Sequence, residues 1–373
     1  MQSELKFNNG KFKIMQIADT QEKYPVNPDT VKLIDLAVKR EKPDLVVFTG
    51  DQICGYAKCF KENTFDKVNE VLSALTKPLN DNDIPFCVTF GNHDRDCKIS
   101  NAKQFYEIYT KFPMLINAKP RNDEDAGTYS VQIKDSKNEK NIFNLYIIDS
   151  NAKEKDGAYS PVYKEQVDWY INERERLKEQ NGTYLPSLVF QHIPVPEIFK
   201  AIKKCSPLKR GAVEAFFSHS NEFYVLFDDS IQNGGFMHES PAAPDINNGE
   251  FEAMKEKGDV LGIFFGHDHI NSFVKNVEGI DLGYTQGCGF NTYGPGKDRG
   301  VRMFVIDEND TKHYETYTVT MKELCDFKPS KPLQEFVLTH APTSVEQVKK
   351  NVLRVGAAAG TVAIICKVLK KIK

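Results

Sequence analysis

The sequence predicts an α/β fold with a mixed or parallel core sheet. Along the first hundred residues, apolar runs that suit buried strands alternate with amphipathic segments that suit helices. Strands separated by helices are typical of βαβ units, in which the strands run parallel. The chain has 373 residues, enough for one large α/β domain with additions or for two smaller domains. With 40% hydrophobic and 27% charged residues, its composition is that of an ordinary soluble globular protein.

The expected elements follow one another in a regular order. The expected strands are residues 11–19, 44–51, 84–94, 141–150, 185–194 and 259–269. The expected helices are residues 27–44, 64–83 and 160–182. The first helix has Asp29 or Thr30 near its start, and the last one ends at Gly182, as helices commonly do. The middle helix is amphipathic, with one apolar face made by Val68, Val71, Leu72 and Leu75.

The later part of the chain is less regular. Residues 200–258 are rich in Gly, Ser, Pro, Asn and charge, and we expect a long, partly irregular insertion there. Residues 302–309 and 313–320 alternate like the two strands of an antiparallel hairpin. These patterns place the main domain at residues 1–325, followed by a linker and a C-terminal helical tail over 326–373.

The C-terminal tail differs from the main domain in its composition. Its last helix is expected over residues 343–373, and its small and apolar stretch of about 12 residues is shorter than the roughly 20 that a bilayer span needs. A helix docked on the domain is one interpretation. Because lysines flank the apolar part, contact with a membrane surface or a partner protein is the other.

The net charge and the cysteine pattern limit the binding partners and the cellular compartment that can be expected for this protein. The formal net charge of −3 gives no general electrostatic reason to expect nucleic-acid binding. The eight cysteines are scattered, without a C-x-x-C pair, and the first residues lack the pattern of a secretory signal. We therefore expect reduced thiols and a cytoplasmic protein.

Polar side chains stand at the carboxyl ends of five expected strands, the edge at which ligands gather in open α/β sheets. Four of the eight histidines fall there. Each motif alone is weak, since a Gly-Asp pair after a strand is usually only a turn. Their joint occurrence, each after an apolar run, indicates a metal site. The positions are Asp19, Gln21, Asp51, Asn92, His93, Asp94, His192, His267, Asp268 and His269.

The order Asp-x-Gln, Gly-Asp, Gly-Asn-His-Asp, Gln-His and Gly-His-Asp-His resembles the calcineurin-like metallophosphoesterase superfamily. The stretches PDLVVFTGDQICG, VFQHIPVPE and GIDLGYTQGCGFNTYG look like its branch with the plant purple-acid-phosphatase-29-like and yeast Dcr2-like phosphatases. The resemblance covers residues 11–320, without the tail. It implies a four-layer fold: a β-sandwich of mixed sheets flanked by helices, with the metal site at the carboxyl ends of strands.

Set on this sequence, the resemblance implies a dinuclear metal site. One metal would be held by Asp19, Gln21, Asp51 and His269, and the other by Asp51, Asn92, His192 and His267, so that Asp51 bridges the two. Mixed oxygen and nitrogen ligands favour Mn²⁺ or Fe, with Zn²⁺ or Mg²⁺ as alternatives. A metal-bridging hydroxide would attack the phosphorus atom in line.

The resemblance also suggests roles for neighbouring residues. His93 would stabilise the developing charge or protonate the leaving oxygen. Asp94 either accepts a hydrogen bond from the other ring nitrogen of His93 or caps the following helix. The candidates for substrate contact are Arg95, Asn291, Tyr293 and Arg299, and a solvated surface position is the alternative for Arg95.

The predicted function is a metal-dependent phosphoric ester hydrolase, specifically a phosphomonoesterase that acts on a phosphoprotein or a small phosphate ester. A phosphodiesterase or nucleotide hydrolase is an alternative, because the core motifs do not choose between mono- and diesters. A non-catalytic metal- or phosphate-binding descendant is another, supported only by Gln21 where the resemblance would put His. An amide oxygen coordinates more weakly than an imidazole, so we expect that metal to be held less firmly, with Mn²⁺ or Mg²⁺ gaining over Zn²⁺.

Overall fold

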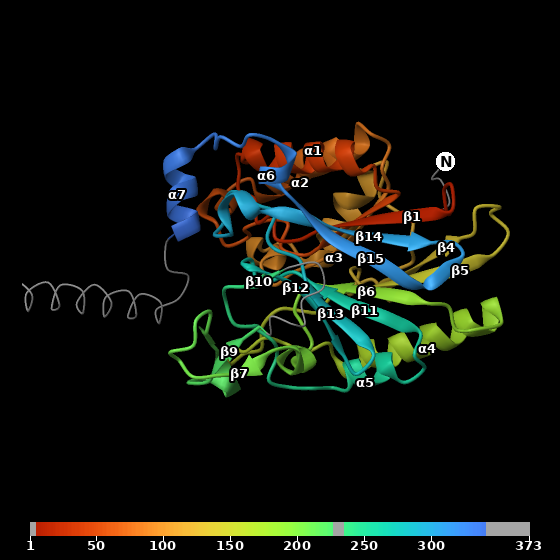
Figure 1. Ribbon diagram of the computed structural model, residues 1–373. Helices are drawn as coiled ribbons and strands as arrows, with labels where there is room; N and C mark the ends of the chain where they lie inside the picture. The colour runs from red at the N-terminus through yellow and green to blue at the C-terminus, as the bar shows by residue number, and fades with distance from the viewer. Residues whose placement is uncertain (1–4, 227–234, 341–373) are drawn as a thin grey trace, which may run out of the picture.

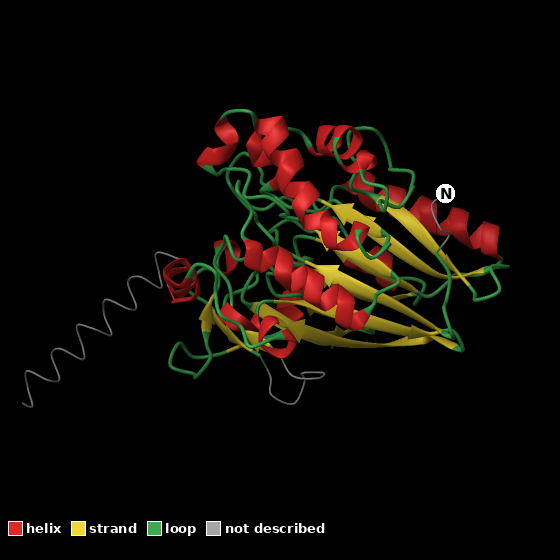
Figure 2. Cartoon of the chain, turned by 90° about the horizontal axis from the view of Figure 1, so that it is seen from above, coloured by secondary structure: helices red, strands yellow, loops and turns green. Residues whose placement is uncertain are grey.

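Two β-sheets packed face to face form the core of the computed structural model, which describes residues 5–226 and 235–340 (Figure 1). Helices α1 and α2 cover the outer face of one sheet, and α4 and α5 cover the outer face of the other. Long loops are concentrated at one end of the sheets (Figure 2). This arrangement confirms the predicted α/β fold of four layers, a β-sandwich of mixed sheets flanked by helices.

The two large sheets differ in size, and a third, small sheet lies in the insertion. The five-stranded sheet has the order β15 (Asp310–Thr320), β14 (Gly300–Asp307), β1 (Lys11–Ile17), β2 (Leu45–Thr49) and β3 (Phe86–Thr89). The seven-stranded sheet has the order β10 (Phe236–Met237), β12 (Asn271–Val277), β13 (Ile280–Tyr284), β11 (Val260–Phe265), β6 (Ser187–Gln191), β5 (Asn141–Ile148) and β4 (Tyr129–Lys134). The small sheet joins β7 (Lys203–Lys204), β9 (Phe223–Val225) and β8 (Val213–Glu214).

The seven-stranded sheet has a parallel centre and two antiparallel edges, whereas the five-stranded sheet is antiparallel only on the β15–β14–β1 side and ends in the parallel strand β3. Strands β1, β2 and β3 run parallel, as do β5, β6, β11 and β13. Strands β14 and β15 form the predicted antiparallel hairpin and add to the free side of β1. The parallel strands bring their carboxyl ends to one edge, where ligand sites form in such sheets.

Aromatic rings and several polar side chains fill the space between the sheets. Phe264 of β11 packs edge-to-face on Phe304 of β14 with ring centroids 4.4 Å apart, and Phe190 of β6 lies 5.3 Å from the same Phe304. Gln16 of β1 donates through its side chain to the carbonyl oxygen of Phe265 at 3.2 Å. This contact fixes the end of β1 beside the end of β11, the two strands that precede Asp19 and His267.

Local sequence signals explain where the long helices begin and end. Helix α1 (Pro28–Glu41) has Asn27 as its N-cap, whose side chain accepts from the backbone of Asp29, so the cap precedes the two residues that the sequence suggested. Helix α2 (Thr64–Asn80) buries its predicted apolar face. Helix α4 (Lys164–Asn181) ends at Gly182, which takes the left-handed conformation with φ 75°. The shorter helices are α3 (Asn101–Glu107), α5 (Glu250–Lys255), α6 (Met321–Leu324) and α7 (Pro332–His340).

The end of the described chain lies against the domain. Within the predicted linker, α7 is held by an ion pair between Glu335 and Arg299 and by a backbone hydrogen bond from Gly294 to Leu338. The helix expected over 343–373 lies outside the described residues, and the boundary at residue 325 stays a prediction. In the part of the chain that the structure describes, no helix is long and apolar enough to cross a membrane.

Replacing Phe264 tests the packing between the sheets. Phe264 is fully buried, so Phe264→Ala leaves a cavity that is expected to lower the free energy of unfolding by about 3–5 kcal/mol. Urea unfolding followed by circular dichroism measures the change. Phe336→Ala is the control, because Phe336 on α7 is 62% exposed and its loss should cost under about 1 kcal/mol. Equal costs for the two variants would contradict the assignment of the core.

Candidate metal centre

The polar residues predicted for the site converge where the two sheets meet. Asp19 follows β1, Asp51 follows β2, and Asn92 follows β3, all in the first sheet. His192 follows β6, and His267 and His269 follow β11, in the second sheet. The seven predicted metal-ligating residues, Gln21 among them, are all buried.

The backbone is strained where the ligands are presented. Asp19, Gln21, Asp51 and His267 have φ values of 51°, 32°, 52° and 74°, in the left-handed region that non-glycine residues rarely adopt. Backbone hydrogen bonds hold the turns, from Asp19 to Gly50 and from Gln21 to Asp51. Strain of this kind persists only where the surrounding structure imposes it, and it concentrates at functional sites.

Asp19, Asp51 and His269 form a cluster that could hold one ion. Their ligand atoms lie within 4.8 Å of one another, and His269 Nε2 is 3.4 Å from Asp19 Oδ1. His192 Nε2 lies 3.4 Å from Asp51 Oδ2, so Asp51 faces this cluster and the second group of predicted ligands. The bridging position that the resemblance implied for Asp51 is compatible with this geometry.

The second predicted group lies close to both Asp51 and Asp19. His267 Nδ1 is 3.2 Å from His192 Nε2, and the backbone N–H of His267 donates to Asp19 at 2.9 Å. Three buried atoms in the two groups have no hydrogen-bond partner: Asp19 Oδ1, Asn92 Oδ1 and His267 Nε2. Buried polar atoms are rarely left unpaired, and all three are good ligand atoms. The residues present therefore fit bound metal ions.

Hydrogen bonds behind the imidazoles set their orientation. His192 Nδ1 is 2.9 Å from the carbonyl oxygen of Thr49, and His269 Nδ1 is 3.0 Å from that of Tyr293. The Tyr293 ring also stacks on His269, with centroids 4.2 Å apart and planes 3° apart. Each contact directs the Nε2 atom toward the carboxylates, as in metal sites whose histidines are oriented by outer partners.

The electrostatics of the centre favour cations. Burial disfavours charge on His192, but Asp51 and Asp19 outweigh it and raise the pKa of the imidazole to about 10. Burial lowers the pKa of His269 to about 4, which keeps that ring neutral and able to ligate. Burial raises the pKa of Asp19 to about 8. At Asp51, burial is outweighed by the charges of His192 and His93, which lower the pKa of that carboxyl. Asp51 is therefore the carboxylate that stays charged and attracts a cation. A metal ion would displace the proton of Asp19, while His269 offers a free nitrogen lone pair.

Gln21 makes two hydrogen bonds in place of a metal contact. Its amide nitrogen donates to Asp51 Oδ2 at 2.9 Å, and its amide oxygen accepts from the Thr292 hydroxyl at 2.8 Å. Rotating the amide by half a turn would direct the oxygen toward Asp51, and the Thr292 hydroxyl could then accept. Ligation by Gln21 thus stays a prediction, and Thr292 is a neighbour that no sequence motif indicated.

Asp96, and not Asp94, is the acidic partner of His93. Asp96 Oδ2 lies 2.7 Å from His93 Nδ1, whereas Asp94 turns inward and accepts four backbone N–H groups at 2.8–3.1 Å, from Gly91, Asp51, Gln52 and Ile53. Both alternatives stated for Asp94 are therefore wrong: it neither contacts the His93 ring nor caps a helix, because it is the first residue of the turn η2 (Asp94–Cys97). Its role is to hold two ligand loops together.

The four candidates for substrate contact make other contacts here. Arg95 pairs with Asp149 at 3.3 Å, and the Tyr293 hydroxyl donates to Glu239 at 3.0 Å. Asn291 donates to Glu22 at 2.6 Å. Arg299 is fully buried, and it donates to the Thr292 carbonyl oxygen at 3.0 Å. These contacts assign Asn291 and Arg299 to the support of the site, and a substrate contact by Arg95 or Tyr293 stays a prediction.

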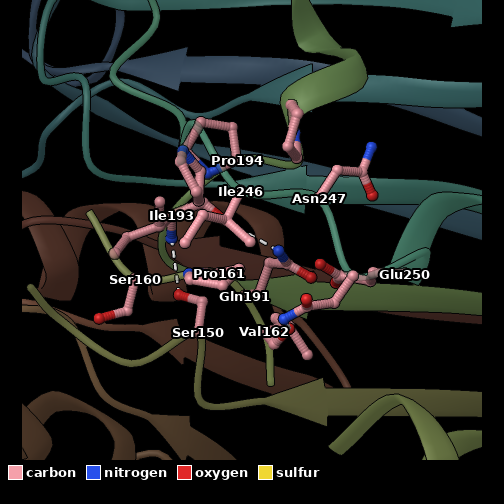
Figure 3. A pocket seen from close by; sticks show the side chains of 13 residues that line it. Ser150, Ser160, Pro161, Val162, Gln191, Ile193, Pro194, Ile246, Asn247 and Glu250 are labelled. Carbon is pink, nitrogen blue, oxygen red and sulfur yellow. Dashed lines mark hydrogen bonds between the residues drawn. The ribbon is translucent and has the colours of Figure 1, made fainter. Parts of the chain in front are cut away.

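A small cavity lies beside the end of β6, the strand that precedes His192 (Figure 3). Gln191, Ser150 and Glu250 line it, and it has room for about one water molecule. Burial, and then the neighbouring Glu197, raise the pKa of Glu250 to about 8. A phosphate ester could not enter a space of this size, so the cavity is not the substrate site.

Comparisons with known proteins agree with this geometry. The family model for calcineurin-like phosphoesterases matches residues 12–271. "Probable inactive purple acid phosphatase 14" of Arabidopsis thaliana is 29% identical, over 80% of this chain and 76% of its own length. "Phosphatase DCR2" of Saccharomyces cerevisiae is 27% identical, over 86% of this chain and 56% of its own. The solved structure of a dimetal phosphatase from Danio rerio has the same fold, with a TM-score of 0.50, 14% identity and coverage of 83% of this chain and 99% of that one.

Removing the Asp94 carboxylate should loosen the metal centre. Asp94→Ala leaves four buried N–H groups without their acceptor, and we expect the free energy of unfolding to fall by about 3 kcal/mol. Urea unfolding of the metal-free protein measures this, and metal titration measures the accompanying loss of affinity. Asp96→Ala is the matched control, expected to change stability by under about 0.5 kcal/mol because Asp96 is on the surface. Unchanged stability of Asp94→Ala would refute the bracing role.

Proposed function

Because this chain belongs to the calcineurin-like phosphoesterase family, we propose that it is a metal-dependent phosphomonoesterase with a dinuclear metal site. The observation that carries the proposal is the set of three buried, unpaired ligand atoms around the carboxylates of Asp19 and Asp51. The substrate proposed is a phosphoprotein or a small phosphate ester. A cytoplasmic location, contact of residues 343–373 with a membrane surface or partner, and the absence of nucleic-acid binding remain predictions.

The proposed metal ligands divide into two groups that share Asp51. One ion would be held by Asp19, Gln21, Asp51 and His269, and the other by Asp51, Asn92, His192 and His267. Mixed oxygen and nitrogen donors favour Mn²⁺ or Fe over Zn²⁺ or Mg²⁺. A pair of such ions supplies the positive charge that activates water near neutral pH and offsets the charge of a phosphoryl group.

His93 is the group of this chain best placed to handle a proton. Its backbone N–H donates to Asp51 at 2.8 Å, which fixes it beside the centre, and its side chain remains partly exposed. With Asp96 on Nδ1, the Nε2 atom is free to donate a proton to a leaving alkoxide. Asp96 keeps the ring in the orientation that this transfer requires.

A second candidate function is a metal-binding protein without turnover. Gln21 favours it, because the amide turns its nitrogen, and not its oxygen, toward the predicted bridging carboxylate. The plant relatives that bear the word "inactive" in their names also favour it. Metal analysis separates the candidates: two ions per chain with turnover support the phosphatase, and one ion without turnover supports the binding protein.

A phosphodiesterase is the nearest catalytic variant, and a diester assay tests it.

Activity toward an aryl phosphate with added Mn²⁺ tests the proposal directly. We expect His93→Ala to lower kcat by about 10²–10⁴-fold, because a positioned proton donor contributes that much. Asp51→Asn should abolish activity and reduce bound metal, because it removes a charge from both predicted metal positions. His313→Ala is the matched control, since His313 is a surface residue on the β15 hairpin. Equal rates for all four proteins would refute the phosphatase.

Gln21 can be tested by changing its ligand strength. Gln21→His should tighten the first metal by about tenfold, and Gln21→Ala should loosen it by a similar factor. Competition with a fluorescent chelator measures the affinity for Mn²⁺, and steady-state assays measure the effect on rate. If neither substitution alters metal affinity or rate, Gln21 is not a ligand and its hydrogen bond to Asp51 is its whole role.

A further inference from the structure

Two exposed or partly exposed tyrosines border the metal centre on the sides of His93 and His267. The Tyr56 ring lies edge-on to the His93 ring with centroids 4.7 Å apart, and 57% of Tyr56 is exposed. The Tyr159 ring lies edge-on to the His267 ring with centroids 4.4 Å apart. No motif of the sequence pointed to either residue, and the metal chemistry uses neither.

Close packing of the backbone places Tyr56 beside His93. The preceding residue, Gly55, lies so near the next loop that a Cβ atom there would be 2.2 Å from the carbonyl oxygen of His93 and 2.8 Å from the backbone nitrogen of Cys97. Only glycine allows this approach. Since His93 is the proposed proton donor to the leaving oxygen, the group released from phosphate would emerge beside the Tyr56 ring.

Tyr159 is placed by a hairpin-like loop after β5. The backbone of Ser160 bonds to Ala152 at 3.1 Å, and that of Glu154 bonds to Ala158 at 2.8 Å. Lys153 on the opposite side of this loop holds its Nζ 5.3 Å from the centroid of the Tyr159 ring. The loop therefore brings an aromatic ring and a positive charge together at the edge of the centre, a combination that suits an aromatic phosphate dianion.

A strained residue of the insertion supports Tyr159 from behind. Phe217 packs edge-to-face on Tyr159 with centroids 5.6 Å apart, and its φ of 53° is rare for a bulky residue. The next residue, Ser218, donates through its hydroxyl to Asp245 at 2.6 Å and anchors the turn. Backbone strain is retained where the position of a side chain matters, and here it places Phe217 against the wall of the site.

We propose that Tyr56 and Tyr159, supported by Phe217, form two aromatic walls that select esters of planar aromatic alcohols. This inference rests on the proposed phosphomonoesterase activity and names its substrate class. Aromatic rings bind one another by stacking and edge-to-face contact beyond the area they bury, whereas a saturated ring of the same size gains only the area. The ligand is an aryl or arylmethyl phosphate, either as a small molecule or as a phosphotyrosine side chain.

The test compares benzyl phosphate with cyclohexylmethyl phosphate, which have similar size and similar primary alkoxide leaving groups. With Mn²⁺ and the full chain, we expect kcat/KM to favour the benzyl ester by about five- to tenfold. Tyr56→Leu and Tyr159→Leu should each reduce this ratio by about threefold, and Tyr56→Phe and Tyr159→Phe should keep it. Tyr106→Leu is the matched control, an exposed tyrosine on α3 that should leave the ratio unchanged. A wild-type ratio near one, or a ratio that the leucine variants leave unchanged, overturns the proposal.

A binding measurement separates this inference from the proposed activity. Calorimetry with phenylphosphonate and cyclohexylphosphonate, neither of which is hydrolysed, should show the same preference and the same loss in the leucine variants. If no ester is hydrolysed but phenylphosphonate still binds more tightly than cyclohexylphosphonate, the proposed phosphatase activity is refuted and the aromatic walls are supported. Equal binding of the two phosphonates, or binding of neither, overturns the walls whatever the activity. Comparing kcat/KM for a phosphotyrosine peptide and for free phenyl phosphate, both of them esters of phenols, separates the two sources. A higher value for the peptide would identify the protein source, and a higher value for phenyl phosphate the small-molecule source.

Discussion

The metal centre depends on one buried carboxylate that is not itself a predicted metal ligand. Asp94 accepts hydrogen bonds from the backbone of Gly91 after β3 and from three successive residues after β2, beginning with Asp51. It therefore joins the two loops that carry Asp51 and Asn92. Burial, and then the nearby charge of Asp51, raise the pKa of the Asp94 carboxyl to about 7. The four N–H donors around Asp94 offset part of the cost of burying it, and without Asp94 they would themselves be buried with no acceptor.

The second sheet contributes nitrogen ligands whose orientation comes from the first sheet and from a distant loop. His192 on the second sheet bonds to the carbonyl oxygen of Thr49 on the first, and His269 bonds to that of Tyr293. The packing of Phe264 on Phe304 thus affects chemistry as well as stability, since it fixes the distance between the sheets. A shift of about 1 Å between them would disturb ligands that lie 3–4 Å apart.

The sequence was sufficient for the fold, and the residues that it predicted as metal ligands lie together in the structure, because both depend on local patterns. Apolar runs followed by Asp, Asn or His mark the strand ends, and the parallel strands bring those ends together. Contacts from irregular loops could not be predicted in this way. Thr292, which contacts Gln21, is 271 positions away from it in the sequence. Asp96, and not Asp94, contacts the His93 ring because η2 turns its third residue back toward His93. The sequence suggested Arg299 as a phosphate ligand, but its side chain is buried and forms an ion pair with Glu335.

Gln21 shows how far one substitution can alter such a centre. An imidazole there would offer a metal an unprotonated ring nitrogen, whereas an amide presents either its donor nitrogen or its weaker acceptor oxygen, depending on its rotation. With its nitrogen on Asp51, Gln21 satisfies one lone pair of that carboxylate. With its oxygen turned toward the centre, it would add a fourth, neutral ligand. Rotation of the amide leaves the carboxylates of Asp19 and Asp51 in place, so a change at Gln21 is predicted to alter how firmly that position holds a cation and not whether the centre attracts one.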